Sequence, residues 1–202
     1  MNRTVKFSIL MAITTIAMML SSGCKKDDPV GKSNIKTDSF DGKLTAQVES
    51  GGATKVMAII GPEIRDFKLY GVKYAECSYS NGGFSISLPG IPSVDLMSVG
   101  DLFKNVLKVS GSTLTYSAPE AQVTDIDLLG FDASDFLKGY FLYKSVDGLT
   151  ICFFVYTDRD VTVTGGTNIA VSLKKGWNRL YQSTEKLATK APSEMKWYFQ
   201  GL

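Results

Sequence analysis

Histidine is absent from all 202 residues of this chain, and there is almost no excess of charge of either sign. Without histidine the protein has no Ser-His-Asp triad, no histidine general base and no histidine metal ligand. The 22 Lys and Arg residues nearly balance the 20 Asp and Glu residues, and they do not cluster beyond residue 39. Nucleic-acid binding therefore has no support in the sequence. We expect a protein that is not an enzyme, with no catalytic residues, no metal and no cofactor.

Cysteine is scarce, since the chain contains only Cys24, Cys77 and Cys152. Cys77 and Cys152 could form a disulfide if the chain reaches an oxidising compartment. They could also be small buried side chains on strands, because free cysteine is among the most buried residue types. The sequence leaves both alternatives open. A nucleophilic thiol is not expected in a chain without histidine to activate it.

A short apolar segment opens the chain. Arg3 and Lys6 precede an apolar run at residues 7–20, which is too short for a comfortable membrane span and is typical of a signal peptide. The small residues 21–23 then lead to Cys24. This pattern resembles the signal of bacterial lipoproteins, in which the cysteine becomes the first mature residue and carries acyl chains such as palmitate. Leucine usually stands three places before that cysteine, whereas here Leu20 is four places before it. An ordinary signal-peptidase site that releases a soluble protein is the alternative.

The residues after Cys24 indicate where the protein is sent. Lys25-Lys26-Asp27-Asp28 resembles the tag by which Bacteroidetes export lipoproteins to the outer face of the outer membrane. Two or more acyl chains on Cys24 would anchor the protein stably, with the membrane as its partner. The polar composition of residues 25–37 predicts a flexible tether. We therefore expect a signal peptide at residues 1–23, a lipidated tether at residues 24–39 and one folded domain at residues 40–202.

Beyond residue 43 the sequence is dominated by strand patterns. Apolar residues alternate with polar ones in short runs, as in Leu44, Ala46 and Val48, and turn sequences such as Asn81-Gly82-Gly83 and Asp147-Gly148 separate these runs. One exception lies between residues 94 and 109, where apolar residues recur every three or four positions and predict one short amphipathic helix with Ser93 or Ser98 as its cap. About ten strands with one helix predict an all-β fold. We expect an antiparallel β-sandwich, immunoglobulin-like or jelly-roll-like, with a closed β-barrel as the alternative.

Three phrases of the sequence carry a wider resemblance. They are YSNGGF at residues 79–84, YTDRDVTVTG at residues 156–165 and LKKGWN at residues 173–178. They resemble a family of Bacteroidetes surface lipoproteins of unknown function. The resemblance implies an all-β fold and a place on the cell surface, but it transfers no active-site residue because these phrases are turn and strand signatures.

Acidic residues occur in pairs that have two possible explanations. Asp158 and Asp160 flank Arg159, and similar pairs are Asp125 with Asp127 and Asp132 with Asp135. Paired carboxylates could bind a cation such as Ca²⁺, or act as acid and base in a hydrolase. Solvated acids on strands and turns explain the same pattern, and we expect this second explanation to hold.

Aromatic residues near the end of the chain are the predicted ligand-binding residues. Trp177, Tyr181, Trp197 and Tyr198 could form a flat patch that holds the apolar face of a sugar ring, although core packing is the alternative for each tryptophan. The sequence thus predicts a non-enzymatic lipoprotein anchored in the outer membrane that binds an extracellular glycan or protein. A structural or assembly accessory of an envelope or pilus-like complex is the second hypothesis, and a hydrolase with paired Asp residues is the third.

Overall fold

The computed structural model describes residues 35, 37–65, 68–91, 95–109, 113–165, 168–184, 186–191 and 194–202. The predicted signal peptide, Cys24 and most of the predicted tether lie outside these residues. The described part is all-β with one short helical segment, as the sequence predicts. No helix in these ranges is long and apolar enough to cross a membrane.

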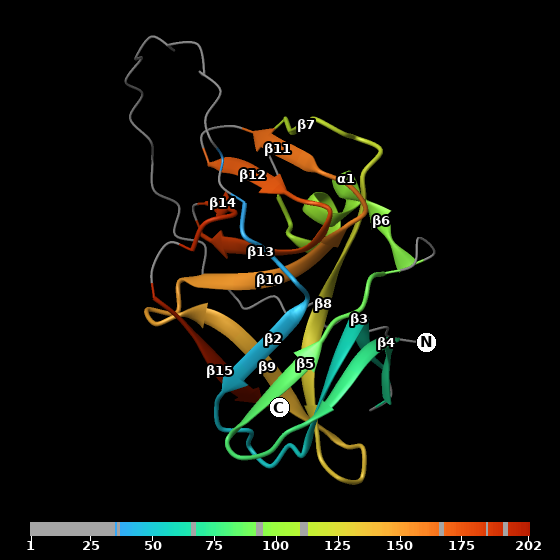
Figure 1. Cartoon of the computed structure of the whole chain (residues 1–202), viewed down its shortest axis with the longest axis vertical. Helices are drawn as coiled ribbons and strands as arrows, with labels where there is room; N and C mark the ends of the chain where they lie inside the picture. Colours follow the sequence, from blue (N-terminus) through green and yellow to red (C-terminus); the bar gives the residue numbers. More distant parts are fainter. Residues whose placement is uncertain are drawn as a thin grey trace, which may run out of the picture.

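The elements follow one another along the chain with short connections (Figure 1). They are β1 (Ser39–Phe40), β2 (Lys43–Gln47), β3 (Lys55–Arg65), β4 (Lys68–Ser78), β5 (Gly83–Ser87), β6 (Met97–Ser98), α1 (Val99–Asp101), the π-helical turn η2 (Leu102–Val106), β7 (Thr115–Tyr116), β8 (Gln122–Phe131), β9 (Leu137–Ser145), β10 (Thr150–Thr157), β11 (Val161–Gly165), β12 (Ile169–Leu173), β13 (Gly176–Ser183), β14 (Leu187–Ala188) and β15 (Met195–Gly201).

Most strands belong to one large, mainly antiparallel sheet. Its order is β4-β3-β8-β9-β10-β13-β14-β12-β11-β7, while β1 pairs with β13, β6 with β8 and β15 with β9. Only the pairing of β12 with β14 is parallel among the described strands. The two ends of this path, β4 and β7, do not pair with each other within the described ranges, so the sheet is not closed. The alternative expectation of a closed barrel is therefore wrong.

Strand β8 connects two parts of the large sheet. Its first half pairs with β10, from Val123↔Thr157 to Ile126↔Phe154, whereas its second half pairs with β9. Strands β9 and β10 share one paired position, Ile151↔Lys144, and then diverge. Figure 1 shows the result, with β3, β4, β9 and β15 in the lower part and β10 to β14 in the upper part.

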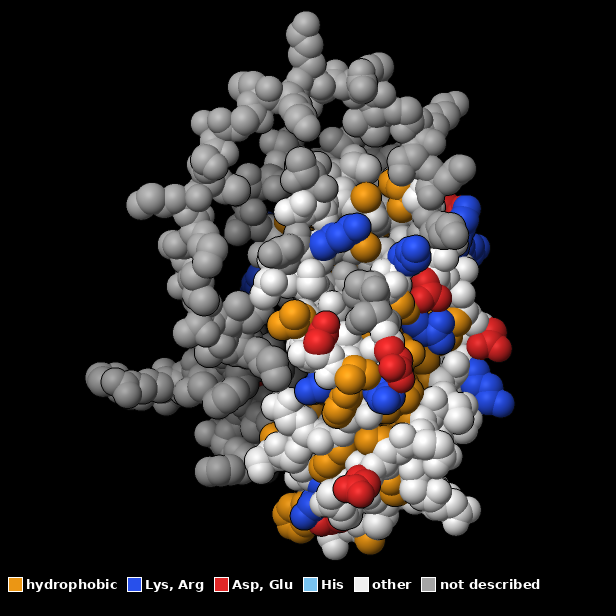
Figure 2. All heavy atoms as spheres, turned by 90° about the vertical axis from the view of Figure 1, so that its left-hand side faces the viewer, with side chains coloured by type: hydrophobic (Ala, Val, Ile, Leu, Met, Phe, Trp, Pro, Cys, Tyr) orange, Lys and Arg blue, Asp and Glu red, His pale blue; other side chains and the backbone are white. Residues whose placement is uncertain are grey.

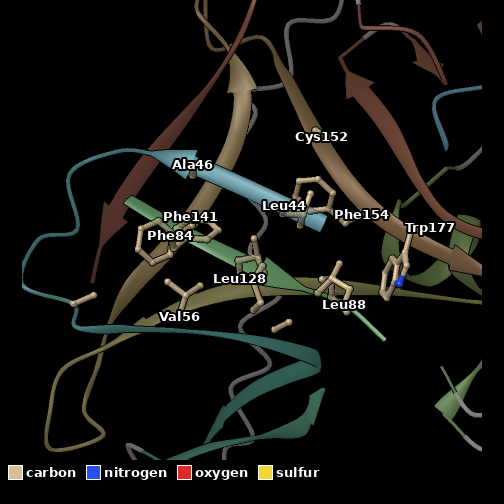
Figure 3. Packing of buried hydrophobic residues seen from close by; sticks show 14 of the residues in the cluster. Leu44, Ala46, Val56, Phe84, Leu88, Leu128, Phe141, Cys152, Phe154 and Trp177 are labelled. Carbon is tan, nitrogen blue, oxygen red and sulfur yellow. The ribbon is translucent and has the colours of Figure 1, made fainter. Parts of the chain in front are cut away.

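A second, two-stranded sheet of β2 and β5 covers the lower part. Leu44 and Ala46 are buried on β2 while their neighbours are exposed, which is the alternation that the sequence shows. Figure 3 shows these side chains and Phe84 directed at the large sheet. The ring of Phe84 packs edge-on against Phe141 at 5.0 Å between centroids. The main hydrophobic core thus lies between the two sheets.

The helical segment seals a second core in the upper part. Ser98 is its N-cap, with Oγ accepting a hydrogen bond from the Asp101 N–H at 3.1 Å, and this is one of the two caps that the sequence suggests. The segment then widens into the π-helical turn η2, which the three- and four-residue spacing does not predict. Leu102 and Phe103 are fully buried in this core, against β8, β11 and β12.

Candidate functional site

Two of the predicted ligand-binding aromatics lie inside the core. Trp177 is 5 % exposed and Tyr181 is 4 % exposed, both on β13. Trp177 donates its Nε1–H to the Pro89 carbonyl at 2.9 Å and packs against the Tyr156 ring. The Tyr181 hydroxyl donates to the Asp38 carboxylate. The Trp177 ring offers no open face to a ligand, and Tyr181 reaches only the wall of a separate cavity of about 270 Å³.

The other two predicted aromatics point to opposite faces of β15. Trp197 is half-buried, stacks on Phe154 and packs edge-on against Phe84, so it belongs to the same core cluster as Trp177 and Tyr181. Tyr198 is half-buried on the other face, where the Lys144 Nζ lies 4.6 Å from its ring centroid. The four side chains therefore form no common surface.

A groove of about 750 Å³ lies elsewhere, between the helical segment and β7. Both elements lie in the upper part of the molecule in Figure 1. The helical segment lines the groove together with Lys108 and Val109. Leu114 and Tyr116, at β7, line it as well. The lining residues are Ser98, Gly100, Asp101, Lys104, Lys108, Val109, Leu114 and Tyr116.

Gly100 lines this groove and has no side chain to fill it. A Cβ placed on Gly100 would lie 3.8 Å from the Ser98 Oγ and 3.9 Å from the Tyr116 hydroxyl oxygen, which are ordinary contact distances. Tyr116 is supported from beneath by Phe103, whose ring meets it edge-on at 6.3 Å. Burial raises the pKa of Tyr116, so its hydroxyl is neutral at physiological pH. The groove thus presents a fixed phenol beside a position without a side chain.

The backbone around the groove is irregular at two consecutive places. The first is the π-helical turn η2, a rare conformation that occurs frequently at functional sites. The second is Lys108, whose φ of +53° lies in the left-handed region. The other described non-glycine residues with positive φ are Asn81 and Asp135, and these residue types tolerate that conformation better than lysine. Such strain concentrates at ligand sites, which supports a functional role for the groove.

Hydrogen bonds to the surrounding fold hold this irregular backbone in place. The Leu107 N–H donates to the Leu102 carbonyl at 3.0 Å, and the Val109 N–H donates to the Phe103 carbonyl at 2.9 Å. The Gln182 side chain on β13 donates to the Leu107 carbonyl at 2.9 Å. Lys108 is therefore fixed between two anchored residues.

The charged groups of the groove are arranged asymmetrically. The Asp101 carboxylate accepts hydrogen bonds from the Ser98 hydroxyl at 2.6 Å and from the Asn105 amide at 3.3 Å. Lys104 and Lys108 are exposed, and neither forms an ion pair with any described residue. The groove consequently combines a fixed acceptor, a neutral phenol and two free ammonium groups.

The acids around Arg159 are engaged in ion pairs. The Arg159 guanidinium contacts Asp158 at 2.9 Å and Glu120 at 3.0 Å. Asp160 accepts from the Lys174 Nζ at 2.6 Å and from the Lys175 N–H at 2.9 Å. These hydrogen bonds lower the pKa values of Asp158 and Asp160. No group of three or more potential metal-binding side chains occurs among the described residues.

Asp125 and Asp127 lie two residues apart on β8, so their side chains leave the same face of the sheet. Desolvation raises the pKa of Asp125 to about 6 and the pKa of Asp127 to about 7, and the Asp125 charge adds to the second shift. Asp127 lines a small cavity of about 90 Å³ where β9 and β10 diverge. Two carboxyls on one strand do not face each other across a cleft, which glycoside hydrolysis requires.

Asp132, Asp135 and the two cysteines make contacts that explain them without a ligand. The Asp132 carboxylate accepts the backbone N–H groups of Ser134 and Phe136, and Asp135 forms an ion pair with Lys55. Cys77 and Cys152 are both free thiols on strands, so no disulfide joins them; Cys152 is buried, whereas Cys77 is half-buried. Burial raises the pKa of each thiol.

Comparisons with protein-family models, with curated proteins and with solved structures find no match for this chain. The site must therefore be interpreted from its own geometry. The sequence indicates Ser98 as a cap, but no motif in it joins Gly100, Lys104, Lys108 and Tyr116, which come from three segments. One available signal was Gly100, since an isolated glycine in a helical pattern often has a packing or functional reason.

Proposed function

We propose that this protein is a non-enzymatic lipoprotein anchored in the outer membrane, that it faces the outside of the cell, and that it binds an extracellular glycan. The anchor is the acylated Cys24, and residues 40–202 form the folded domain. The two packed layers support an antiparallel β-sandwich as its architecture. The observation that carries the binding proposal is the groove over Gly100.

The chemistry of the groove matches that of a sugar. A sugar ring presents apolar C–H faces and a set of hydroxyls that both donate and accept. Tyr116 supplies an aromatic ring with a polar end, Asp101 supplies an acceptor, and Lys104 supplies donors. The open shape of the groove suits a chain that continues beyond the contacted residue.

The test fills the groove without disturbing the core. Gly100→Leu places a branched side chain beside Tyr116, and Gly100→Ala is the matched control because its single Cβ meets only ordinary contacts. On a glycan array followed by titration of the hits, we expect wild type and Gly100→Ala to bind alike. Gly100→Leu should bind at least about tenfold more weakly, a loss of about 1.4 kcal/mol. Equal binding by Gly100→Leu would contradict the groove as the binding site.

A second function, an assembly accessory, has one specific observation in its favour. Among the described strands, β15 pairs only with β9, so one edge of β15 faces no other described strand. An open edge can accept an extended strand from a protein partner. A stoichiometric protein that co-purifies with the wild type would favour this function over glycan binding.

A further inference from the structure

Six described cations outside the groove form an ion pair with a neighbouring acid. Ion pairs join Lys73 to Glu76, Arg179 to Asp38 and Lys196 to Glu194, in addition to those of Lys55, Arg159 and Lys174. Figure 2 shows basic and acidic side chains side by side on one face of the molecule. Other lysines have no ion-pair partner among the described residues, and two such lysines that line one groove can act together on a bound molecule.

Lys104 and Lys108 are such a pair. Together with Asp101 they give the groove a net charge of +1, from two ammonium groups and one carboxylate. Asp101 offsets one of these two positive charges, although it forms no ion pair with either lysine and its oxygens accept hydrogen bonds from Ser98 and Asn105. A bound molecule would therefore meet two cations that no described acid contacts, in a groove of net positive charge.

The conformation of Lys108 adds an independent observation. Glycine is the residue that a φ of +53° favours, and a side chain there costs about 1 to 2 kcal/mol. The chain nevertheless places a long cationic side chain at this position, on the rim of the groove. A left-handed residue commonly follows the C-cap of a helix, so the φ itself has a local cause. The presence of lysine there in place of glycine is explained if its ammonium group contacts a ligand.

We infer that the groove takes an oligosaccharide that carries acidic groups, whose carboxylate or sulfate groups meet Lys104 and Lys108 while a sugar ring packs beside Tyr116. This inference rests on the proposed glycan binding and specifies its ligand class. Charge-assisted hydrogen bonds from the two ammonium groups hold the acidic groups. Asp101 accepts from the ring hydroxyls, which keeps the charged groups of the sugar on the lysine side.

The experiment compares matched ligands by isothermal titration with the purified full-length protein. Oligogalacturonate carries carboxylates, and its methyl ester has the same rings without the charge. Dextran sulfate and dextran oligosaccharides provide the same comparison for sulfate. We expect at least one acidic ligand to bind about tenfold or more tightly than its neutral partner, and its affinity should fall as salt is raised from about 0.05 M to about 0.5 M.

Lys108→Gly tests the residue that carries the inference. It removes the ammonium group at a backbone position that glycine occupies without strain, so the variant should be at least as stable as wild type. We expect it to bind the acidic ligand about fivefold more weakly, with a smaller salt dependence. Lys43→Ala, which removes an exposed lysine on β2, should bind like wild type.

The outcomes separate this inference from the proposed function. Equal binding of acidic and neutral partners, with loss on Gly100→Leu, would overturn the acidic ligand class and leave glycan binding in place. Unchanged binding of the acidic ligand by Lys108→Gly together with Lys104→Ala would also overturn it. Failure of wild type to bind any of the four ligands would overturn the inference, and a blank glycan array would then remove the proposed function as well.

Discussion

Trp177 is held by contacts that depend on its complete burial. Its indole N–H reaches the Pro89 carbonyl, and Phe40 and Tyr156 pack against its ring. Gly42 approaches so closely that a Cβ there would lie 3.1 Å from the Trp177 Cδ1. At this position an aromatic residue stabilises the fold and cannot also serve as a ligand platform.

The first prediction follows from that burial. Trp177→Phe removes the hydrogen bond and part of the ring, so the free energy of unfolding should fall by about 1 to 3 kcal/mol. Glycan affinity should be unchanged because Trp177 does not line the groove. Urea denaturation and a parallel titration measure both effects. A large loss of glycan affinity in a folded Trp177→Phe variant would indicate that the binding site lies on β13 and β15 instead.

A second prediction at the residue scale concerns the carboxyl groups of Asp125 and Asp127 on β8. In the folded chain the pKa values of Asp125 and Asp127 are about 6 and about 7, whereas the pKa of a carboxyl in an unfolded chain is about 4. Between about pH 4 and pH 7 the folded chain therefore holds protons that the unfolded chain has released. The free energy of unfolding should fall as the pH rises through this window.

Asp127→Asn checks the sign of this dependence. The variant lacks one of the two titrating groups, so its stability should decline less with pH. At about pH 8 it should exceed wild type by on the order of 1 kcal/mol, since wild type must then hold a desolvated charge. Urea midpoints at several pH values give the result. If stability fell equally with pH in wild type and in Asp127→Asn, Asp127 would not be one of the groups that cause the pH dependence.

At the scale of elements, β5 binds the small sheet to the large one through Phe84. This ring packs edge-on against both Phe141 and Trp197, at 5.0 and 5.4 Å between centroids. Phe84→Ala should therefore reduce the free energy of unfolding by about 3 to 5 kcal/mol. Ser87→Ala, an exposed change on the same strand, should alter it by less than about 0.5 kcal/mol. Similar losses in both variants would contradict the two-layer core.

Some elements of the fold can be predicted from the sequence and others cannot, and the difference has physical reasons. The alternation of Leu44 and Ala46 with polar residues identifies β2 because one face of it is buried. The Ser98 cap is visible because it depends on a local hydrogen bond. The π-helical turn leaves no such local pattern, and the division of β8 between β9 and β10 depends on pairings that are distant in the sequence.

At the scale of the whole molecule, local sequence patterns predict the fold class but not the residues that meet in the groove. The all-β class follows from many short periodic segments, whereas the groove needs Gly100, Lys108 and Tyr116 to meet from separate segments. The predicted aromatic patch fails at this scale. The fold buries Trp177 and Tyr181 in the core and packs the half-buried Trp197 against it.

A prediction at this scale concerns the proposed anchor. Cys24→Ala removes the acylated side chain, and a signal-peptide segment alone does not retain a mature protein at the membrane. We expect wild type to pellet with outer membranes and to be degraded by protease added to intact cells. The variant should leave the membrane fraction. Protease-resistant wild type would place the protein in the periplasm and favour an envelope assembly partner.

Hydrogen–deuterium exchange with and without an acidic oligosaccharide tests the central claim most directly. The account predicts slower exchange at residues 97–109 and 113–116 on ligand addition, and no such protection in Gly100→Leu. It predicts no change on β13 and β15, where Trp177, Tyr181, Trp197 and Tyr198 lie. Protection of β13 and β15 with an unchanged groove would contradict the account and restore the aromatic strands as the binding surface.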